Sequence, residues 1–166
     1  TRVSEPYFSN GPVFWNETAY DAMGRVSAVL AADGNNLSFD YDESASVCSQ
    51  SGAARQVRTS NGLGQKQLEI RNALGETTAV YDSTCGLVTY DYDSVGNLTR
   101  LTGADGIVTA MTYDQAGRKT SLDDDDKGYW QYAYNPLGEM TRQQDSKQQA
   151  MDFVFDVLGR VTTRYE

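Results

Sequence analysis

The residue types that most often perform chemistry in proteins are scarce in this chain of 166 residues. It contains no His, so the commonest general base and the commonest metal ligand are both missing, and no Ser-His-Asp or Cys-His site can be built from it. Its two cysteines, Cys48 and Cys85, are too few for a zinc cluster or a disulfide framework. They could form one bridge or remain free thiols, and the sequence leaves both alternatives open.

A run of four carboxylates, Asp123 to Asp126, followed by Lys127, is the most prominent candidate for a cation site. Carboxylates are typical ligands of Ca²⁺, but the run lacks the alternating spacing of an EF-hand loop. It also stands just before Gly128, where a turn is expected, so a solvated turn is the favoured interpretation. Carboxylate pairs could also hydrolyse glycosides, but most Asp residues fall in expected turns. We therefore predict no metal, no cofactor and no enzyme activity.

The net charge of the chain argues against some classes of binding partner. The formal net charge is -9, from 23 acidic and 14 basic residues, and an acidic surface repels phosphate backbones. Nucleic acid is therefore not expected as a partner. No apolar run approaches the roughly 20 residues that a membrane helix needs, so we expect no membrane insertion by this segment.

The elements that carry these residues repeat regularly. Glycines separated by 21 residues occur at Gly75, Gly96, Gly117, Gly138 and Gly159. A second glycine lies near the middle of most intervals, at Gly34, Gly86, Gly106 and Gly128. Turns every 10 or 11 residues leave about seven residues for each strand, which is typical of an antiparallel β meander. Each 21-residue unit is predicted to be one hairpin, with no long helix and about a dozen strands in all.

The turns share one motif, in which an aromatic residue and Asp or Asn precede Gly by four and three positions. An Asp or Asn side chain there can accept the backbone N–H two residues on, and Gly adopts the left-handed backbone that such a turn requires. The expected turn residues are Tyr20, Asp21, Gly24, Arg25, Asn72, Gly75, Tyr92, Asp93, Gly96, Tyr113, Asp114, Gly117, Arg118, Tyr134, Asn135, Gly138, Phe155, Asp156, Gly159 and Arg160.

Residues before each turn alternate between bulky apolar and small or polar side chains, which places aromatic groups on one face of the sheet. Tyr90, Trp130 and Tyr132 belong to this face. Two interpretations are open: these rings form sheet core, which is favoured, or they form a ligand-stacking surface for carbohydrate.

Tyr-Asp-x-x-Gly-Arg followed by Val or Leu and Thr, repeated near 21 residues, resembles the YD or RHS repeat. Gly24-Arg25-Val26-Ser27 and Gly159-Arg160-Val161-Thr162 carry the resemblance best. The resemblance implies a β-sheet that spirals into a hollow shell. In bacterial Rhs proteins and insecticidal toxin complexes such a shell encloses a toxic domain, and in teneurins a related shell belongs to an adhesion receptor. The repeats are expected over residues 13–166, after a lead-in segment at 1–12, with a loop inserted at 43–54.

The sequence and this resemblance therefore predict a structural segment of a larger secreted or cell-surface protein of toxin type and bacterial origin, with carbohydrate binding or adhesion as the alternative. Its expected partners are the rest of the parent shell protein, the cargo domain and, under the alternative, carbohydrate. A segment separated from its neighbours presents unpaired strand edges, and we expect the isolated fragment to self-associate.

Overall fold

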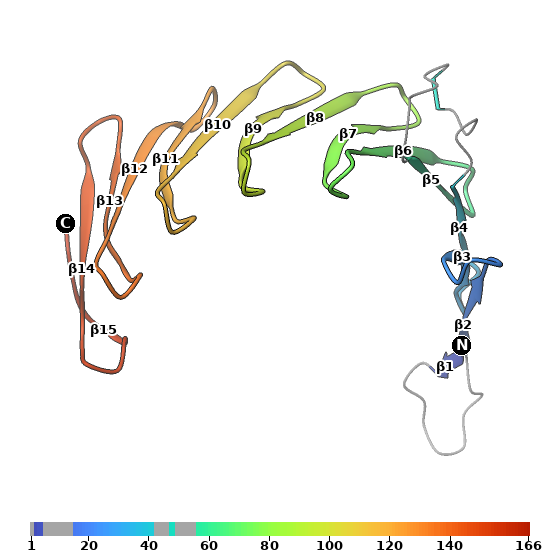
Figure 1. The fold of residues 1–166 in the computed structure, drawn as a ribbon, viewed down its shortest axis with the longest axis horizontal. Helices are drawn as coiled ribbons and strands as arrows, with labels where there is room; N and C mark the ends of the chain where they lie inside the picture. The colour runs from blue at the N-terminus through green and yellow to red at the C-terminus, as the bar shows by residue number, and fades with distance from the viewer. Residues whose placement is uncertain (1, 5–14, 42–46, 49–55) are drawn as a thin grey trace. The chain divides into compact units, whose positions relative to one another are not determined.

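The structure is a computed structural model that describes residues 2–4, 15–41, 47–48 and 56–166 (Figure 1). Within these residues the chain forms strands and turns and contains no helix. The described residues therefore include no helix that could span a membrane. The strands are β1 (Arg2–Ser4), β2 (Trp15–Tyr20), β3 (Val26–Leu30), β4 (Leu37–Asp40), β5 (Gln56–Asn61), β6 (Lys66–Arg71), β7 (Thr77–Tyr81), β8 (Leu87–Tyr92), β9 (Leu98–Thr102), β10 (Val108–Tyr113), β11 (Lys119–Asp124), β12 (Gly128–Tyr134), β13 (Met140–Asp145), β14 (Ala150–Phe155) and β15 (Val161–Tyr165).

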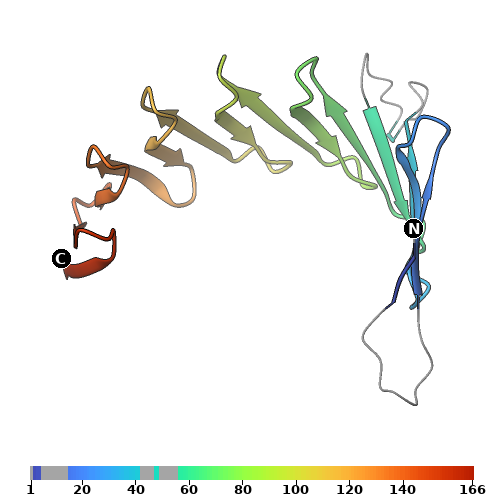
Figure 2. The same cartoon turned by 60° about the horizontal axis from the view of Figure 1, so that its bottom comes forward.

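The chain is divided into two compact units, Thr1–Leu87 and Val88–Glu166. In each unit the strands lie side by side in the order of the chain, as both views show (Figure 2), and the paired neighbours run antiparallel. The predicted all-β meander of hairpins is confirmed. Of the lead-in predicted over residues 1–12, the structure describes Arg2–Ser4, which form β1. Of the loop predicted at 43–54 it describes Val47 and Cys48, and the other residues of both segments lie outside the described residues.

Each motif turn joins its strands with a one-residue register shift at the residue before the motif Asp or Asn, which is aromatic in every motif turn except that at Arg71. Tyr113 pairs with Lys119 across the turn, although Thr112 pairs with Ser121, so the second strand contributes one extra residue. The same shift occurs at Tyr134, where the partner is Met140. This is the geometry of a type I turn followed by a glycine bulge, and it explains why Gly follows the motif Asp by three positions.

The positive φ expected of the motif glycines is observed at Gly24, Gly75, Gly96, Gly117, Gly138 and Gly159. One glycine is displaced from its expected role: in the β7–β8 turn the positive φ of 70° belongs to Cys85, and Gly86 follows it. In the β13–β14 turn Gln148 takes φ 66° where no glycine is available. The turn geometry is therefore kept even where the residue type does not favour it.

Few side chains are buried in this architecture. Among the described residues the buried hydrophobic side chains are Val47, Leu68 and Met111. The strands form single layers, and most of their side chains are half-buried by neighbours on the same face rather than covered by a second layer.

Gln148→Gly is predicted to stabilise the chain, because a left-handed non-glycine residue costs about 1–2 kcal/mol and the added flexibility of the unfolded chain offsets only part of that gain. We expect a gain of about 0.5–1 kcal/mol in the free energy of unfolding, measured by urea denaturation. The reciprocal control is Gly138→Gln, at φ 89° with open space around the added side chain, which should destabilise by a similar amount. If both variants had the same free energy of unfolding as the parent chain, the assignment of strain to Gln148 would be wrong.

Candidate functional site

The recurring turn is built around one side-chain oxygen. Oδ1 of Asp114 accepts the backbone N–H groups of Ala116 at 2.9 Å and of Arg118 at 3.0 Å. The backbone adds two bonds, from Gly117 N–H to the Asp114 carbonyl at 3.0 Å and from Asp114 N–H to the Arg118 carbonyl at 2.9 Å. The same two side-chain bonds recur in turns that begin at Asp21, Asn61, Asn72, Asp82, Asp93, Asn135, Asp145 and Asp156.

In seven of these turns the first residue also bonds the side chain four positions later, and the two residue types are complementary. Aspartates face donors, with Arg25, Arg118 and Arg160 at 2.7, 2.6 and 2.7 Å from their partners and Asn97 at 2.8 Å. Asparagines face residues with an acceptor oxygen, in the pairs Asn61–Gln65, Asn72–Glu76 and Asn135–Glu139. When the first residue changes from acceptor to donor, the fifth residue changes from donor to acceptor. The hydrogen bond between the two side chains is therefore retained although both residue types differ.

Arginine and tyrosine then connect one repeat to the next. The Arg118 guanidinium donates to the carbonyl oxygen of Asn135 at 2.9 Å and lies 5.1 Å from the ring centre of Tyr134. In return, the Tyr134 hydroxyl donates to the Lys119 carbonyl at 2.8 Å. We call these five residues, Asp114, Arg118, Lys119, Tyr134 and Asn135, the repeat clamp. It ties the β10–β11 turn to the β12–β13 turn.

The repeat clamp has partial counterparts elsewhere. In the first unit the Arg25 guanidinium lies 4.2 Å from the Tyr41 ring centre, and the Tyr41 hydroxyl donates to the Val26 carbonyl at 3.0 Å. In the second unit the Tyr113 hydroxyl donates to the Leu98 carbonyl at 2.8 Å. A tyrosine hydroxyl therefore crosses to the preceding hairpin at a constant separation of fifteen residues.

Charge in these turns follows from the same bonds. The Arg118 backbone N–H, with its guanidinium, holds the pKa of Asp114 below its usual range, and Arg160 does the same for Asp156. The Asn97 side-chain amide lowers the pKa of Asp93. These carboxylates are kept ionised as hydrogen-bond acceptors within turns. Their perturbed pKa values therefore have a structural cause.

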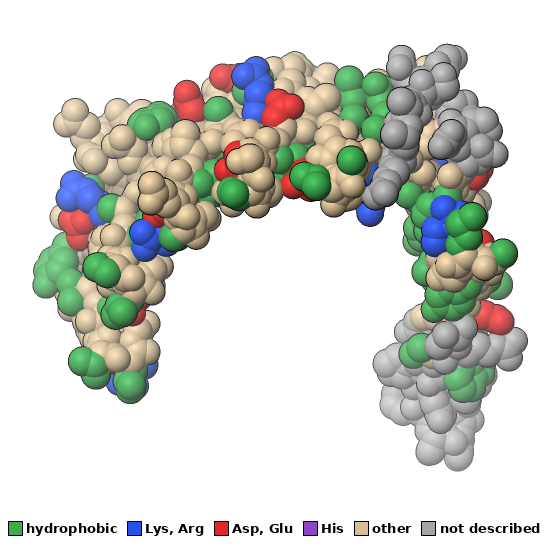
Figure 3. Space-filling view, viewed as in Figure 1, with side chains coloured by type: hydrophobic (Ala, Val, Ile, Leu, Met, Phe, Trp, Pro, Cys, Tyr) green, Lys and Arg blue, Asp and Glu red, His purple; other side chains and the backbone are tan. Residues whose placement is uncertain are grey.

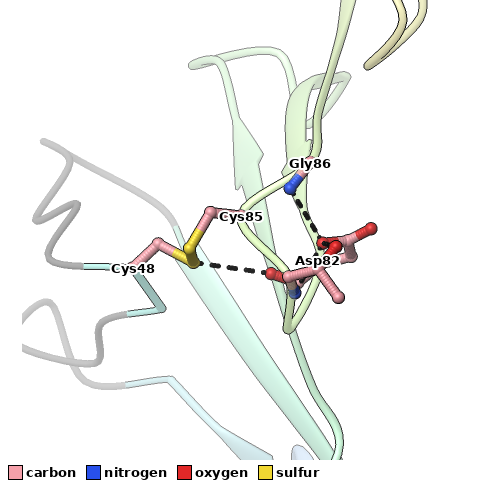
Figure 4. Close-up of a disulfide and its surroundings, with 5 residues drawn as sticks. Cys48, Asp82, Cys85 and Gly86 are labelled. Carbon is pink, nitrogen blue, oxygen red and sulfur yellow. Dashed lines mark hydrogen bonds between the residues drawn. A yellow bond between two sulfur atoms is a disulfide. The ribbon is translucent and has the colours of Figure 1, made fainter.

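The two cysteines are joined in a disulfide, with their Cα atoms 5.5 Å apart (Figure 4). The sequence left this pairing open because 37 residues separate the two positions. Cys85 stands in the β7–β8 turn, where Asp82 Oδ1 accepts the N–H of Gly86 at 2.8 Å. Cys48 Sγ lies 3.6 Å from the Asp82 carbonyl oxygen. The bridge thus fastens the chain between β4 and β5 to this turn.

The acidic run ends strand β11 with Asp123 and Asp124 and continues into the β11–β12 turn with Asp125 and Asp126. Asp124 Oδ2 accepts the Thr109 hydroxyl at 2.7 Å, and its Oδ1 accepts the N–H groups of Asp126 and Lys127 at 3.1 and 2.9 Å. Asp125 Oδ2 accepts the N–H of Val108 at 3.0 Å. These carboxylates are directed at protein donors. In the part of the chain that the structure describes, no three metal-ligating side chains converge.

The aromatic residues predicted to form the core or a ligand-stacking face are half-buried, which matches neither interpretation fully. Trp130 and Tyr132 lie on β12, and Tyr90 lies on β8. Trp130 donates its indole N–H to the Lys127 carbonyl at 3.2 Å. It borders a shallow hollow of about 530 Å³ whose other lining residues are Gln143, Asp145, Gln148, Gln149, Ala150, Met151 and Glu166. Neither Tyr132 nor Tyr90 lines this hollow. Strands β9, β10 and β11 separate Tyr90 from the other two residues, so the structure does not bring the three predicted rings together.

Sequence reasoning missed two features of the turns. The complementary pair between the first and fifth turn residues was visible as co-variation of Asp with Arg and of Asn with Glu inside the chain. The tyrosine hydroxyl bond had a weaker signal, the fixed place of Tyr before the turn. Neither the disulfide nor the strained Gln148 carries a local signal.

Comparison with known proteins agrees with this geometry. Residues 92–129 match the RHS repeat family. Three solved structures share the fold, all at low identity, so they establish fold alone: the Tc holotoxin pore of Photorhabdus luminescens with a substitution in TccC3 (14% identity, TM-score 0.68), TcdB2-TccC3 without its hypervariable C-terminal region (15%, 0.68) and TcdB2-TccC3 (10%, 0.64). The matches cover 90–92% of this chain but only 9% of each of those chains. No curated protein sequence matches.

Exchange of the complementary pair tests its role in the turn. Asp156→Asn places an amide opposite the Arg160 donors, and Arg160→Glu places two carboxylates together, so each single variant should unfold at lower denaturant than the parent chain. Asp156→Asn combined with Arg160→Glu recreates the Asn135–Glu139 arrangement and should recover stability. Urea denaturation measures the coupling between the two positions.

The reciprocal exchange, Asn135→Asp with Glu139→Arg, is the matched control and should show the same recovery. If the two single effects simply add in both double variants, the paired side chains contribute nothing to the turn.

Proposed function

We propose that the chain, whose residues 92–129 match the RHS repeat family, forms a stretch of wall in a hollow β-shell that encloses the toxic cargo domain of a secreted, bacterial toxin-type protein. The fold shared with Tc toxin chains over nine-tenths of this chain is the observation that carries the proposal. A passive wall needs a sheet that can be extended indefinitely by equal units, and the repeat clamp supplies that continuity between hairpins.

The sheet's composition supports a structural role. Its perturbed carboxylates serve turns, its acidic run bonds protein donors, and its chain carries no His. The Cys48–Cys85 disulfide supports a location outside the cytosol, because such bonds form and persist in oxidising compartments. In this proposal the partners of the segment are the remainder of the shell protein and its cargo domain.

A protease-protection assay on the full-length protein tests enclosure. The cargo domain should resist added protease while the shell is intact. Asp93→Ala with Asp114→Ala removes two turn acceptors and should speed cleavage of the cargo, because the wall opens locally more often. Gln115→Ala, at an exposed position of the same turn, is the control and should leave protection unchanged. A cargo domain that is digested equally fast in the native protein and alone would refute enclosure.

A second candidate function, saccharide binding, is favoured by the hollow beside Trp130. An aromatic ring bordered by amide and carboxylate side chains is a common arrangement for sugar recognition, with apolar stacking and polar orientation. Glycan-array binding of millimolar affinity or better should be lost in Trp130→Ala and kept in Trp15→Ala, which removes an exposed indole elsewhere. A blank array would remove this candidate.

A further inference from the structure

The tips of alternate hairpins carry exposed aliphatic side chains. In the second unit the residue just before the left-handed turn position is Val95, Ala116, Leu137 or Leu158 in successive motif turns. Val95, Leu137 and Leu158 are 79%, 84% and 72% exposed. We call these four residues the apolar tip row. Hydrophobic side chains recur at successive hairpin ends in Figure 3.

The apolar tip row occupies one edge of the unit. Its turns join β8 to β9, β10 to β11, β12 to β13 and β14 to β15, so all four lie at the same ends of antiparallel strands. Turns at the opposite edge carry Asp105, Asp126, Lys127 and Lys147. The two residues at each tip of the apolar edge are uncharged throughout, in a chain of net charge -9.

Turn formation does not require these aliphatic side chains. The residue before the left-handed position contributes only its backbone N–H to the turn, as Leu137 does to Asn135 Oδ1 at 3.0 Å. Thr84 and Lys147 fill the same position in other turns with the same hydrogen bonds. Polar residues are the usual occupants of such exposed turns. The aliphatic residues therefore need a reason outside the turn.

The spacing of the row indicates what covers it. Neighbouring strands are about 4.8 Å apart, so tips on one edge recur every 9–10 Å or so. A partner that buries each tip must present apolar groups at that interval, and an array of the same hairpins does so. Depletion of charge is typical of the centre of protein interfaces, and here it lets two acidic chains approach.

We propose that the apolar tip row is a docking surface for a second copy of this chain, whose own apolar tip row meets it edge against edge. The first unit has the same feature by itself: Met23 and Leu74, at the tips of the β2–β3 and β6–β7 turns, are 80% and 78% exposed. The contact does not depend on an enclosed cargo, so it stands or falls separately from the proposed function.

A second copy of this chain carries the required array and serves as the probe. Sedimentation velocity from about 1 to about 100 µM should show reversible association. Leu137→Ser with Leu158→Ser should raise the dissociation constant about tenfold or more, because two of the three large apolar side chains of the row are lost. Both side chains are more than 70% exposed, so the double variant should fold as the parent chain does, which urea denaturation verifies.

The matched control is Leu63→Ser. Leu63 is 83% exposed at the same turn position, but its turn joins β5 to β6 and lies at the opposite edge from Met23 and Leu74. This variant should associate like the parent chain. A parent chain that stays monomeric to about 100 µM overturns the proposal. Association that persists unchanged in the Leu137→Ser, Leu158→Ser variant also overturns it and assigns the contact to strand edges or sheet faces.

Discussion

One hydrogen-bond acceptor, the side-chain oxygen of the first turn residue, is the interaction on which the rest of the fold depends. It accepts two backbone N–H groups that a tight turn would otherwise leave without a protein partner, and it does so in nine turns that begin with Asp or Asn. The bond forms within five residues. A hairpin can therefore be specified locally, which matters in a single layer of strands that buries very few side chains.

Because each hairpin is specified locally, each residue of the motif has a role of its own. Asp or Asn closes the turn, Gly permits its left-handed position, and Arg both pairs with Asp and reaches the next hairpin, as Arg118 does at Asn135. Tyr contributes the hydroxyl that crosses to the preceding hairpin. In the last repeat the corresponding residue is Phe155, which has no hydroxyl to make this bond. The residue that corresponds to Arg118 in that repeat is Arg160, whose side chain is far more exposed. The clamp is therefore a module that individual repeats carry in part.

The sequence could predict what is local and periodic. The spacing of the glycines predicts the hairpins, and the Asp or Asn three residues before each motif glycine predicts the type of turn. The Cys48–Cys85 bridge could not be predicted, since it joins residues 37 positions apart across a stretch where the 21-residue register is lost. Cys85 and Gln148 take the left-handed conformation because the surrounding ladder fixes the turn, and tertiary constraint of this kind overrides residue preference. The half-burial of Trp130 and Tyr132 also depends on neighbouring strands that periodicity alone does not place.

In this sheet several large hydrophobic side chains stay exposed to solvent and contribute little to stability. Full burial of a leucine side chain contributes about 1.5–3 kcal/mol, and Leu74, Leu137 and Leu158 obtain little of it here. Their positions at hairpin tips, rather than on strand faces, mean that a second layer over the sheet would not cover them. Only a contact along the edge can do so. Edge contact also leaves both faces of the sheet free, one of which must remain accessible if a wall is to surround a cargo. The turn residues that fold each hairpin thus also determine which edge of the sheet is suited to meet another.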